Sequence, residues 1–208
     1  MLDAALRPLI DPPLDRIGRA LAARGVSADA ITVTGFGLGL LAMLAIAGGA
    51  YGTGLVLLLL NRLADGLDGA VARHSRLTDL GGFLDIVLDF ITYAGLVFAF
   101  AVAEPAENGL AAAFLLFAFM GTGSSFLAFA IMAAKRRLAT ERRGRKSLYY
   151  LGGLTEGSET ILFFVLACLL PGWFPLLACL FGGLCWLTTL GRILAGRQLL
   201  RDAGDAAA

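Results

Sequence analysis

Six apolar stretches, each about as long as a membrane-crossing helix, follow one another along the chain. A helix needs roughly 20 apolar residues to cross the hydrocarbon core of a bilayer. Hydrophobic residues make up 58% of the 208 residues and charged residues only 16%, against roughly 25% charged residues in soluble domains. The sequence therefore predicts an all-α integral membrane protein with six transmembrane helices, at residues 31–50, 53–73, 81–103, 108–134, 151–170 and 173–192.

Apart from Arg62, which lies inside the second stretch, Lys and Arg residues occur at alternate connections between these stretches. They precede the first stretch, lie between the second and third and between the fourth and fifth, and follow the sixth. The turns at 51–53, 104–108 and 171–173 contain none. Because basic loops remain in the cytoplasm, we expect both termini and the two basic loops to be cytoplasmic.

Residues 1–25 are predicted to form a juxtamembrane segment. Leu14, Ile17 and Leu21 recur at near-helical spacing, which predicts an amphipathic helix on the membrane surface, broken at Pro12-Pro13. A solvated arm is the alternative. The expected domain organisation is then this segment, a six-helix domain over residues 26–195 and a cytoplasmic tail over 196–208.

Four aspartates and one arginine interrupt the second and third stretches. Each charge costs roughly 2.5–3.5 kcal/mol near the centre of a membrane helix, so the cluster needs a compensating partner. Four carboxylates and one guanidinium leave a formal net charge of about −3, which ion pairing within the cluster cannot neutralise. A bound cation is the better explanation for the group, which consists of Arg62, Asp65, Asp68, Asp85 and Asp89.

The spacing of these aspartates predicts a single cage. Asp65 and Asp68 are three residues apart, and Asp85 and Asp89 are four apart, so each pair shares one helix face. At 1.5 Å per residue, all four lie roughly 6–12 Å inside the cytoplasmic boundary. Carboxylate ligands without His or Cys favour Mg²⁺ or Mn²⁺, with Ca²⁺ as an alternative. We expect the cage to hold two such ions. Arg62 is expected to form an ion pair within the cluster.

Read as one string, Asp65-Gly-Leu-Asp68-Gly69-Ala-Val-Ala72-Arg73, followed by Gly81, Asp85 and Asp89, resembles the signature of the CDP-alcohol phosphatidyltransferase family. That signature is D-x-x-D-G-x-x-A-R, a short loop, and G-x-x-x-D-x-x-x-D. It fixes eight positions on two helices, and the six-helix plan of the family covers nearly the whole chain. The sequence is similar to a proteobacterial inner-membrane branch of that family.

The resemblance implies a phosphotransferase of phospholipid biosynthesis. It would transfer a substituted phosphate from a CDP-alcohol, such as CDP-diacylglycerol, to an acceptor alcohol and release CMP. By position, the four aspartates would bind metal and Asp89 would also act as the general base. Arg73 and Gly69 would hold the diphosphate and nucleotide, and Ala72 and Gly81 would shape the cytidine pocket. A homodimer in the bacterial inner membrane, with the active site facing the cytoplasm and no nucleic-acid partner, is also implied.

A second, weaker match lies at the start of the first stretch. Many members carry P-N-x-[IL]-T, and this chain has Ala28-Asp29-Ala-Ile-Thr32. Asp29 can still cap the helix. Thr32 is a candidate for the nucleotide pocket, with capping of the helix start as the alternative.

Two groups of charges are candidates for binding the acceptor. Lys135 and Arg136 open a basic segment that suits a phosphorylated acceptor, although topology and attraction to anionic lipid also explain it. Glu156 and Glu159 suit a hydroxyl-rich or cationic acceptor, with helix capping as the alternative. His74 is expected to be a solvated loop residue without a catalytic role.

Two other functions fit parts of the sequence. The same motif would serve transfer of a CDP-linked head group to a lipid alcohol. A cation transporter could use the aspartates as an ion path, but it leaves the spacing of the motif and Arg73 unexplained.

Overall fold

The structure, a computed structural model, describes residues 2–135 and 153–205, and within them every regular element is a helix. The α-helices are α1 (Leu2–Ala23), α2 (Ala28–Ala47), α3 (Tyr51–His74), α4 (Asp79–Ala103), α5 (Pro105–Lys135), α6 (Gly157–Leu169) and α7 (Phe174–Asp205), and a short 3₁₀-helix, η1 (Pro171–Trp173), joins the last two. The all-α prediction is confirmed for these residues.

Among the described residues, four helical segments are long and apolar enough to cross a membrane, namely Ala28–Ala47, Asp79–Ala103, Pro105–Lys135 and Pro171–Gln198. Helix α3 has 24 residues, which is a sufficient length, but Arg62, Asp65 and Asp68 interrupt its apolar sequence. Helix α6 has only 13 residues, or roughly 20 Å of rise, against a hydrocarbon core of about 30 Å. The fifth predicted span, residues 151–170, is therefore shorter in the structure than expected.

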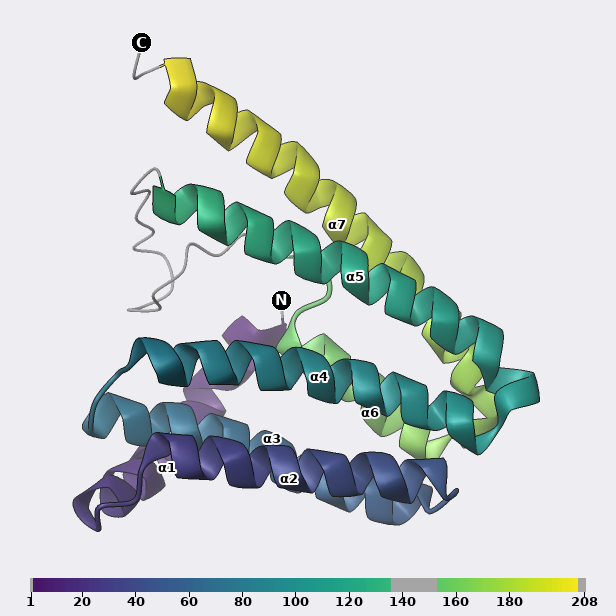
Figure 1. Cartoon of the computed structure of the whole chain (residues 1–208), viewed down its shortest axis with the longest axis horizontal. Coiled ribbons are helices and arrows are strands. Elements are labelled where there is room, and N and C mark those ends of the chain that lie inside the picture. The colour runs from purple at the N-terminus through teal and green to yellow at the C-terminus, as the bar shows by residue number, and fades with distance from the viewer. Residues whose placement is uncertain (1, 136–152, 206–208) are drawn as a thin grey trace.

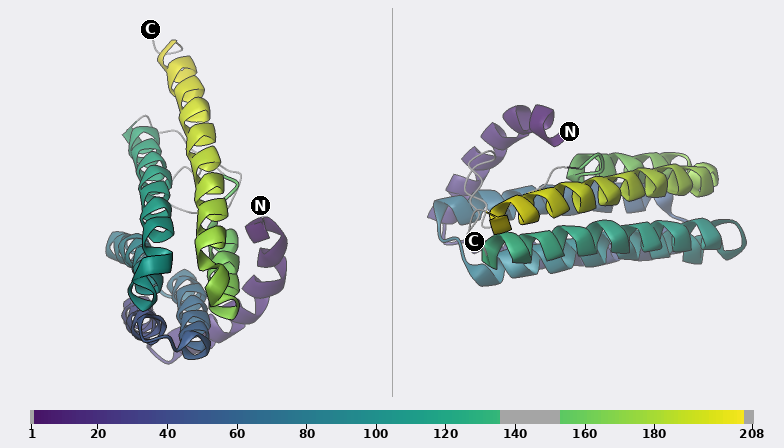
Figure 2. Two further views of the ribbon diagram at one scale, coloured as in Figure 1. Left: turned by 90° about the vertical axis from the view of Figure 1, so that its right-hand side faces the viewer. Right: turned by 90° about the horizontal axis from the view of Figure 1, so that it is seen from above.

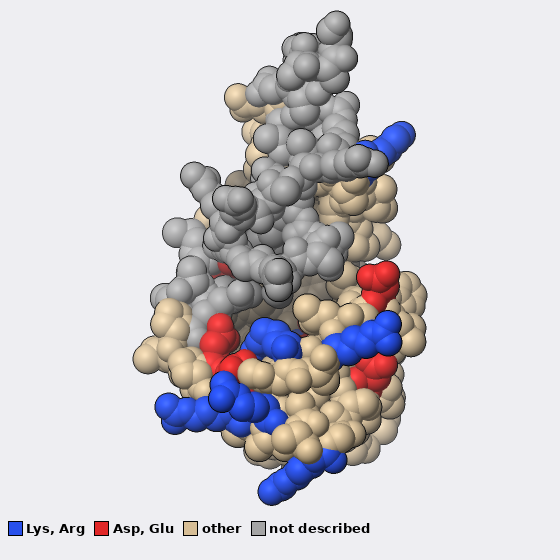
Figure 3. Space-filling model, turned by 90° about the vertical axis from the view of Figure 1, so that its left-hand side faces the viewer, with Lys and Arg blue, Asp and Glu red and all other residues tan. Residues whose placement is uncertain are grey.

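The connections of the helices lie at two opposite ends of the molecule (Figure 1). One end holds the α1–α2 and α3–α4 connections and the last turns of α5 and α7. The other end holds the α2–α3, α4–α5 and α6–α7 turns. Helices α5 and α7 pair with each other and diverge from the remaining helices toward the first end, as the second view shows (Figure 2). Charged side chains gather on the first end (Figure 3).

The aromatic core lies between α4, α6 and α7, toward the second end. Phe100 stacks on Phe174 with ring centroids 4.5 Å apart, and Phe163 stacks on Phe181 at 4.8 Å. These rings and the apolar side chains around them hold α4 against α6 and α7. Asp85 and Asp89 of the predicted cage lie in the opposite, N-terminal half of α4. The aromatic core therefore anchors α4 without filling the space around these aspartates.

Three local expectations are corrected. Helix α1 continues through Pro8, Pro12 and Pro13 instead of breaking there, and it follows a bent path (Figure 2), as expected where proline removes helical hydrogen bonds. The cap of α2 is Ser27, whose hydroxyl accepts from the Ala30 amide at 3.2 Å, with Asp29 in the first turn. The connection between α2 and α3 was expected at residues 51–53 but lies at residues 48–50. Gly49 in this connection has a φ of +76°, a conformation that glycine adopts without steric cost.

Helix α1 lies against α3 with almost no space between their backbones. A Cβ added at Gly18 would lie 2.6 Å from the Ala70 Cβ and 2.8 Å from the Ala70 carbonyl carbon. We therefore expect Gly18→Ala to destabilise α1 docking by about 1–3 kcal/mol through overpacking, although alanine favours a helix by about 1 kcal/mol. Hydrogen exchange of α1 should increase, and the thermal midpoint should fall.

Gly37→Ala is the matched control, because a Cβ at Gly37 meets nothing within 4 Å. This variant should keep or raise the midpoint. Equal behaviour of the two variants would contradict the close approach at Gly18.

Candidate active site

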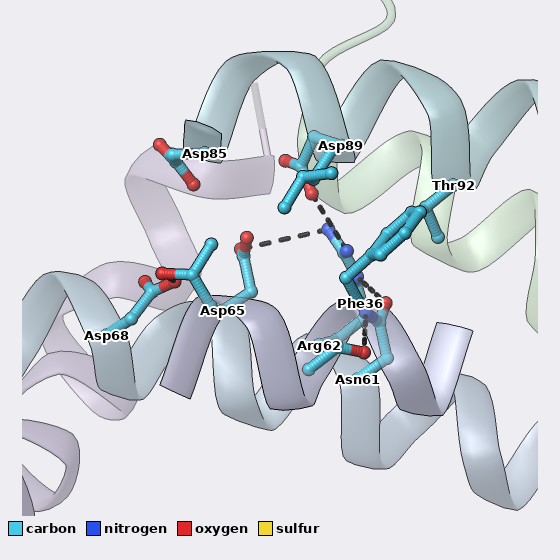
Figure 4. Close-up of a pocket in the computed structure, with 11 residues that line it drawn as sticks. Phe36, Asn61, Arg62, Asp65, Asp68, Asp85, Asp89 and Thr92 are labelled. Carbon is cyan, nitrogen blue, oxygen red and sulfur yellow. Dashed lines mark hydrogen bonds and ion pairs between the residues drawn. The ribbon is translucent and has the colours of Figure 1, made fainter. Parts of the chain in front are cut away.

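A cavity lies between α2, α3 and α4, in the half of the bundle next to the α3–α4 connection. Each of the three helices contributes polar side chains to it (Figure 4). The residues that line it are Thr32, Gly35, Phe36, Asn61, Arg62, Asp65, Asp68, Asp85, Leu88, Asp89 and Thr92. The four aspartates predicted from spacing thus share one cavity.

Three of the aspartates form a compact group of oxygen ligands. Asp65, Asp68 and Asp85 each offer one carboxylate oxygen, and these atoms lie within 4.8 Å of one another. Asp68 is buried, and the Thr32 hydroxyl donates to its Oδ2 at 2.5 Å. An all-oxygen group with excess negative charge fits a hard divalent cation such as Mg²⁺ or Mn²⁺.

Asp89 lines the same cavity but is paired with Arg62. The Arg62 Nη2 donates to Asp89 Oδ1 at 2.8 Å, and Nη1 lies 3.7 Å from Asp65 Oδ2. Arg62 makes two further hydrogen bonds: Nη1 donates to the Tyr93 hydroxyl and Nε donates to Asn61 Oδ1, both at 2.8 Å. The ion pair predicted for Arg62 is confirmed, and it joins α3 to α4.

Asn61 connects this network to α2. Its Nδ2 donates to the Gly35 carbonyl at 2.8 Å, and the residue is almost fully buried. Gly35 and Gly39 keep α2 close enough for this contact, since a Cβ at Gly39 would lie 3.3 Å from the Asn61 side chain. The three helices around the cavity are therefore tied together by polar contacts.

Comparison with known proteins identifies the family. The profile of the CDP-alcohol phosphatidyltransferases matches residues 25–192, which include the whole cavity. The chain belongs to the CDP-alcohol phosphatidyltransferase family. Members of this family are phosphotransferases, so this protein is an enzyme of that class and the choice between enzyme and cation transporter is decided.

Two relatives of known sequence match different shares of this chain. "Inner membrane protein YnjF" of Escherichia coli is 54% identical over 202 residues, covering 97% of this chain and 98% of the relative. "Archaetidylinositol phosphate synthase" of Pyrococcus horikoshii is 34% identical over 98 residues, covering 47% of this chain and 52% of the relative. The first relative supports a bacterial inner-membrane protein, and the second supports CDP-alcohol phosphotransfer in phospholipid synthesis.

A solved structure of the family has the same fold. It is the phosphatidylinositol phosphate synthase PgsA1 of Mycobacterium tuberculosis, crystallised with CDP-DAG bound. The TM-score is 0.65 with 19% sequence identity, over 88% of this chain and 92% of the solved chain. At this identity the likeness establishes the fold alone.

The residues predicted to bind the nucleotide lie in two places. Thr32 lines the cavity, whereas Gly69, Ala72 and Arg73 lie on the last two turns of α3 and Gly81 on the first turn of α4. The Gly81 amide donates to the capping hydroxyl of Thr78 at 3.0 Å. Their roles toward a nucleotide remain predictions.

His74 differs from the expectation of a solvated loop residue. It is the last residue of α3, and its Nε2 lies 2.9 Å from Asp15 Oδ2 on α1. Asp15 Oδ1 also accepts from the Arg73 Nε at 3.4 Å. The hydrogen bond to His74 lowers the pKa of the Asp15 carboxyl below its usual value, so Asp15 is negatively charged at neutral pH.

Three of the four predicted acceptor residues, Glu156, Glu159 and Lys135, lie outside the lining of the cavity. Glu156 and Glu159 form a reciprocal capping box at the start of α6: the Glu156 amide donates to Glu159 Oε2 at 3.1 Å. The capping alternative is thereby confirmed. Lys135 is exposed at the end of α5, and Arg136 lies outside the described residues. Acceptor binding by these residues remains a prediction.

Two residues of the site network escaped prediction from the sequence. Tyr93 lies four residues after Asp89 on the same face of α4, and this spacing could have indicated its contact with Arg62. Asp15 had no such signal, because its partners Arg73 and His74 are 58 and 59 residues away along the chain.

Proposed function

We propose that this protein transfers a phosphatidyl group from CDP-diacylglycerol to an acceptor alcohol and releases CMP. The observation that carries the proposal is the group of Asp65, Asp68 and Asp85, with Asp89 in the same cavity. The mycobacterial structural neighbour, crystallised with CDP-DAG, supports the choice of donor.

We further propose that Asp65, Asp68, Asp85 and Asp89 hold two Mg²⁺ or Mn²⁺ ions. Bound ions would neutralise the diphosphate and stabilise the leaving CMP. Arg73, at the exposed end of α3, would contact the diphosphate through its guanidinium. Thr32, Gly69, Ala72 and Gly81 would border the nucleotide.

Asp89 is proposed as the general base. Its carboxylate would accept the proton of the acceptor hydroxyl while the hydroxyl oxygen attacks the phosphorus of the phosphatidyl group. The new phosphorus–oxygen bond forms as the bond to the CMP oxygen breaks. Arg62 would hold Asp89 in place through Oδ1, the atom that it contacts at 2.8 Å.

The proposed setting is a homodimer in the inner membrane, with six membrane passes, both termini cytoplasmic and the cavity open to the cytoplasm. Support comes from the basic residues near the first end of the bundle, which include Arg16, Arg19, Arg24, Arg73 and Arg76. Positively charged segments remain on the cytoplasmic side. In this proposal the six-helix domain covers residues 26–195, preceded by the juxtamembrane segment (residues 1–25) and followed by the cytoplasmic tail (residues 196–208).

The deciding experiment measures CMP release by the purified protein with CDP-diacylglycerol, Mn²⁺ or Mg²⁺, and a panel of neutral and phosphorylated alcohols. Lipid products identify the acceptor. A parallel reaction with CDP-linked head groups and diacylglycerol tests the reverse assignment of donor. Absence of metal-dependent CMP release with every donor and acceptor would refute the proposal.

Asp89→Asn should lower the turnover number by about 100- to 10,000-fold, the usual contribution of a general base. The amide keeps the shape and a hydrogen-bonding oxygen for Arg62, but it cannot accept the proton. The KM for the CDP donor should change much less than the turnover number. Full activity of this variant would exclude Asp89 as the base.

A further inference from the structure

Helix α1 covers the segment of α3 that carries the family signature. Gly18 lies against Ala70, and a Cβ at Gly66 would come within 2.8 Å of the Leu14 side chain. Both contacts involve residues between Asp65 and Arg73, on the side of α3 that faces α1. The position of α1 is therefore fixed relative to the signature by steric contact.

This contact places one carboxylate of α1 beside the signature arginine. Asp15 Oδ1 accepts from Arg73 Nε at 3.4 Å, and Asp15 Oδ2 lies 2.9 Å from His74 Nε2. Arg19, on the same helix, is 3.9 Å from Asp15 Oδ2. Asp15 thus contacts both residues that end α3, and its two oxygens are used on different partners.

The geometry of the Arg73 contact leaves the phosphate-binding end of the guanidinium clear of Asp15. A guanidinium has five N–H donors in a planar fork, of which Nε supplies one. Asp15 contacts Nε, whereas the end-on pair of N–H groups, one on Nη1 and one on Nη2, lies at the opposite end of the guanidinium from Nε. Nη1 lies back over the preceding turn, 3.7 Å from where a Cβ of Gly69 would be. A side chain held in this way is pre-organised for bidentate binding to phosphate.

We propose that Asp15 is a positioning residue for Arg73, which it holds ready to bind the diphosphate of the CDP donor. The inference rests on the proposed function and adds α1 to the donor site. Arg73 is about half exposed, with 49% of its side chain accessible, so without Asp15 it would sample many rotamers. Asp15 acts through Arg73 and does not itself contact the donor.

The alternative hypothesis is that Asp15 weakens donor binding, because its negative charge repels the diphosphate. A carboxylate near an anionic substrate lowers its affinity, and removing any nearby carboxylate would then improve binding. Asp11 provides the matched comparison. It is an exposed carboxylate one helical turn before Asp15 on the same helix, so Asp11→Asn makes the same change in charge without removing a contact to Arg73.

The test measures CMP release from CDP-diacylglycerol in nanodiscs of fixed lipid composition. We expect Asp15→Asn to raise the KM for the donor about three- to tenfold with the turnover number nearly unchanged, and Asp15→Glu to restore most of the loss. Asp11→Asn should match the wild type. In an Arg73→Gln background, Asp15→Asn should not raise the KM for the donor any further. If Asp15 had only a general role in folding, its substitution would still impair the protein in that background.

Three outcomes would overturn the inference. Asp15→Asn could behave like Asp11→Asn, it could lower the KM, or its effect could persist unchanged beside Arg73→Gln. Each outcome leaves the proposed function intact as long as the wild type turns over and Arg73→Gln is impaired. Absence of CMP release from the wild type would instead refute the proposed function, and the inference with it.

Discussion

Asp85→Asn is expected to reduce Mn²⁺ affinity and CMP release by at least about 100-fold, since changes even to groups around metal ligands cost 10- to 100-fold. The carboxylate oxygen of Asp85 lies within 4.8 Å of those of Asp65 and Asp68, and Asp85 is the member of this group from α4. Its removal leaves Asp89 as the one proposed metal ligand from α4. Titration with Mn²⁺ followed by electron paramagnetic resonance measures the affinity independently of turnover.

Asp79→Asn is the control for this experiment. Asp79 lies in the first turn of the same helix and is exposed, so the variant makes the same chemical change away from the cavity. It should retain both Mn²⁺ affinity and activity. Unchanged Mn²⁺ affinity in Asp85→Asn would show that the three aspartates do not form the metal site.

Arg62→Gln should destabilise the metal-free protein by about 2–4 kcal/mol, somewhat below the roughly 3–5 kcal/mol for breaking a fully buried pair. Only 8% of the Arg62 side chain is exposed, whereas its partner Asp89 is 30% exposed. The substitution removes the positive charge within a group of four carboxylates. Thermal unfolding in EDTA should therefore show a large loss of stability.

The same variant should lose less stability in Mn²⁺ than in EDTA, because bound ions replace the missing positive charge. By linkage, a metal-free state that is destabilised more than the metal-bound state implies tighter Mn²⁺ binding. Turnover should still fall, because Asp89 loses its partner. Arg62→Lys retains the charge but not the planar fork, so it should recover stability in EDTA better than activity. Equal losses in EDTA and Mn²⁺ would indicate a role in packing alone.

Much of the candidate site could be predicted because it depends on spacing within single helices. Asp65 and Asp68 share a face of α3 through their separation of three residues, and Asp85 and Asp89 share a face of α4 through their separation of four. Their matching depth followed from the rise per residue, and the structure places all four around one cavity. Periodicity could not predict the start of α6, because the capping box of Glu156 and Glu159 begins the helix inside the predicted span 151–170.

By itself, the sequence determined the helical class, four of the apolar spans and the facing of the aspartates, since each depends on residues within a few turns of one another. Only the tertiary structure decided that Arg62 reaches Asp89 and Tyr93 across to α4 and that Asp15 of α1 contacts Arg73 and His74. These contacts depend on how closely separate helices approach and in which register. Close approach at residues such as Gly18 and Gly39 sets that register, and helical periodicity alone does not encode it.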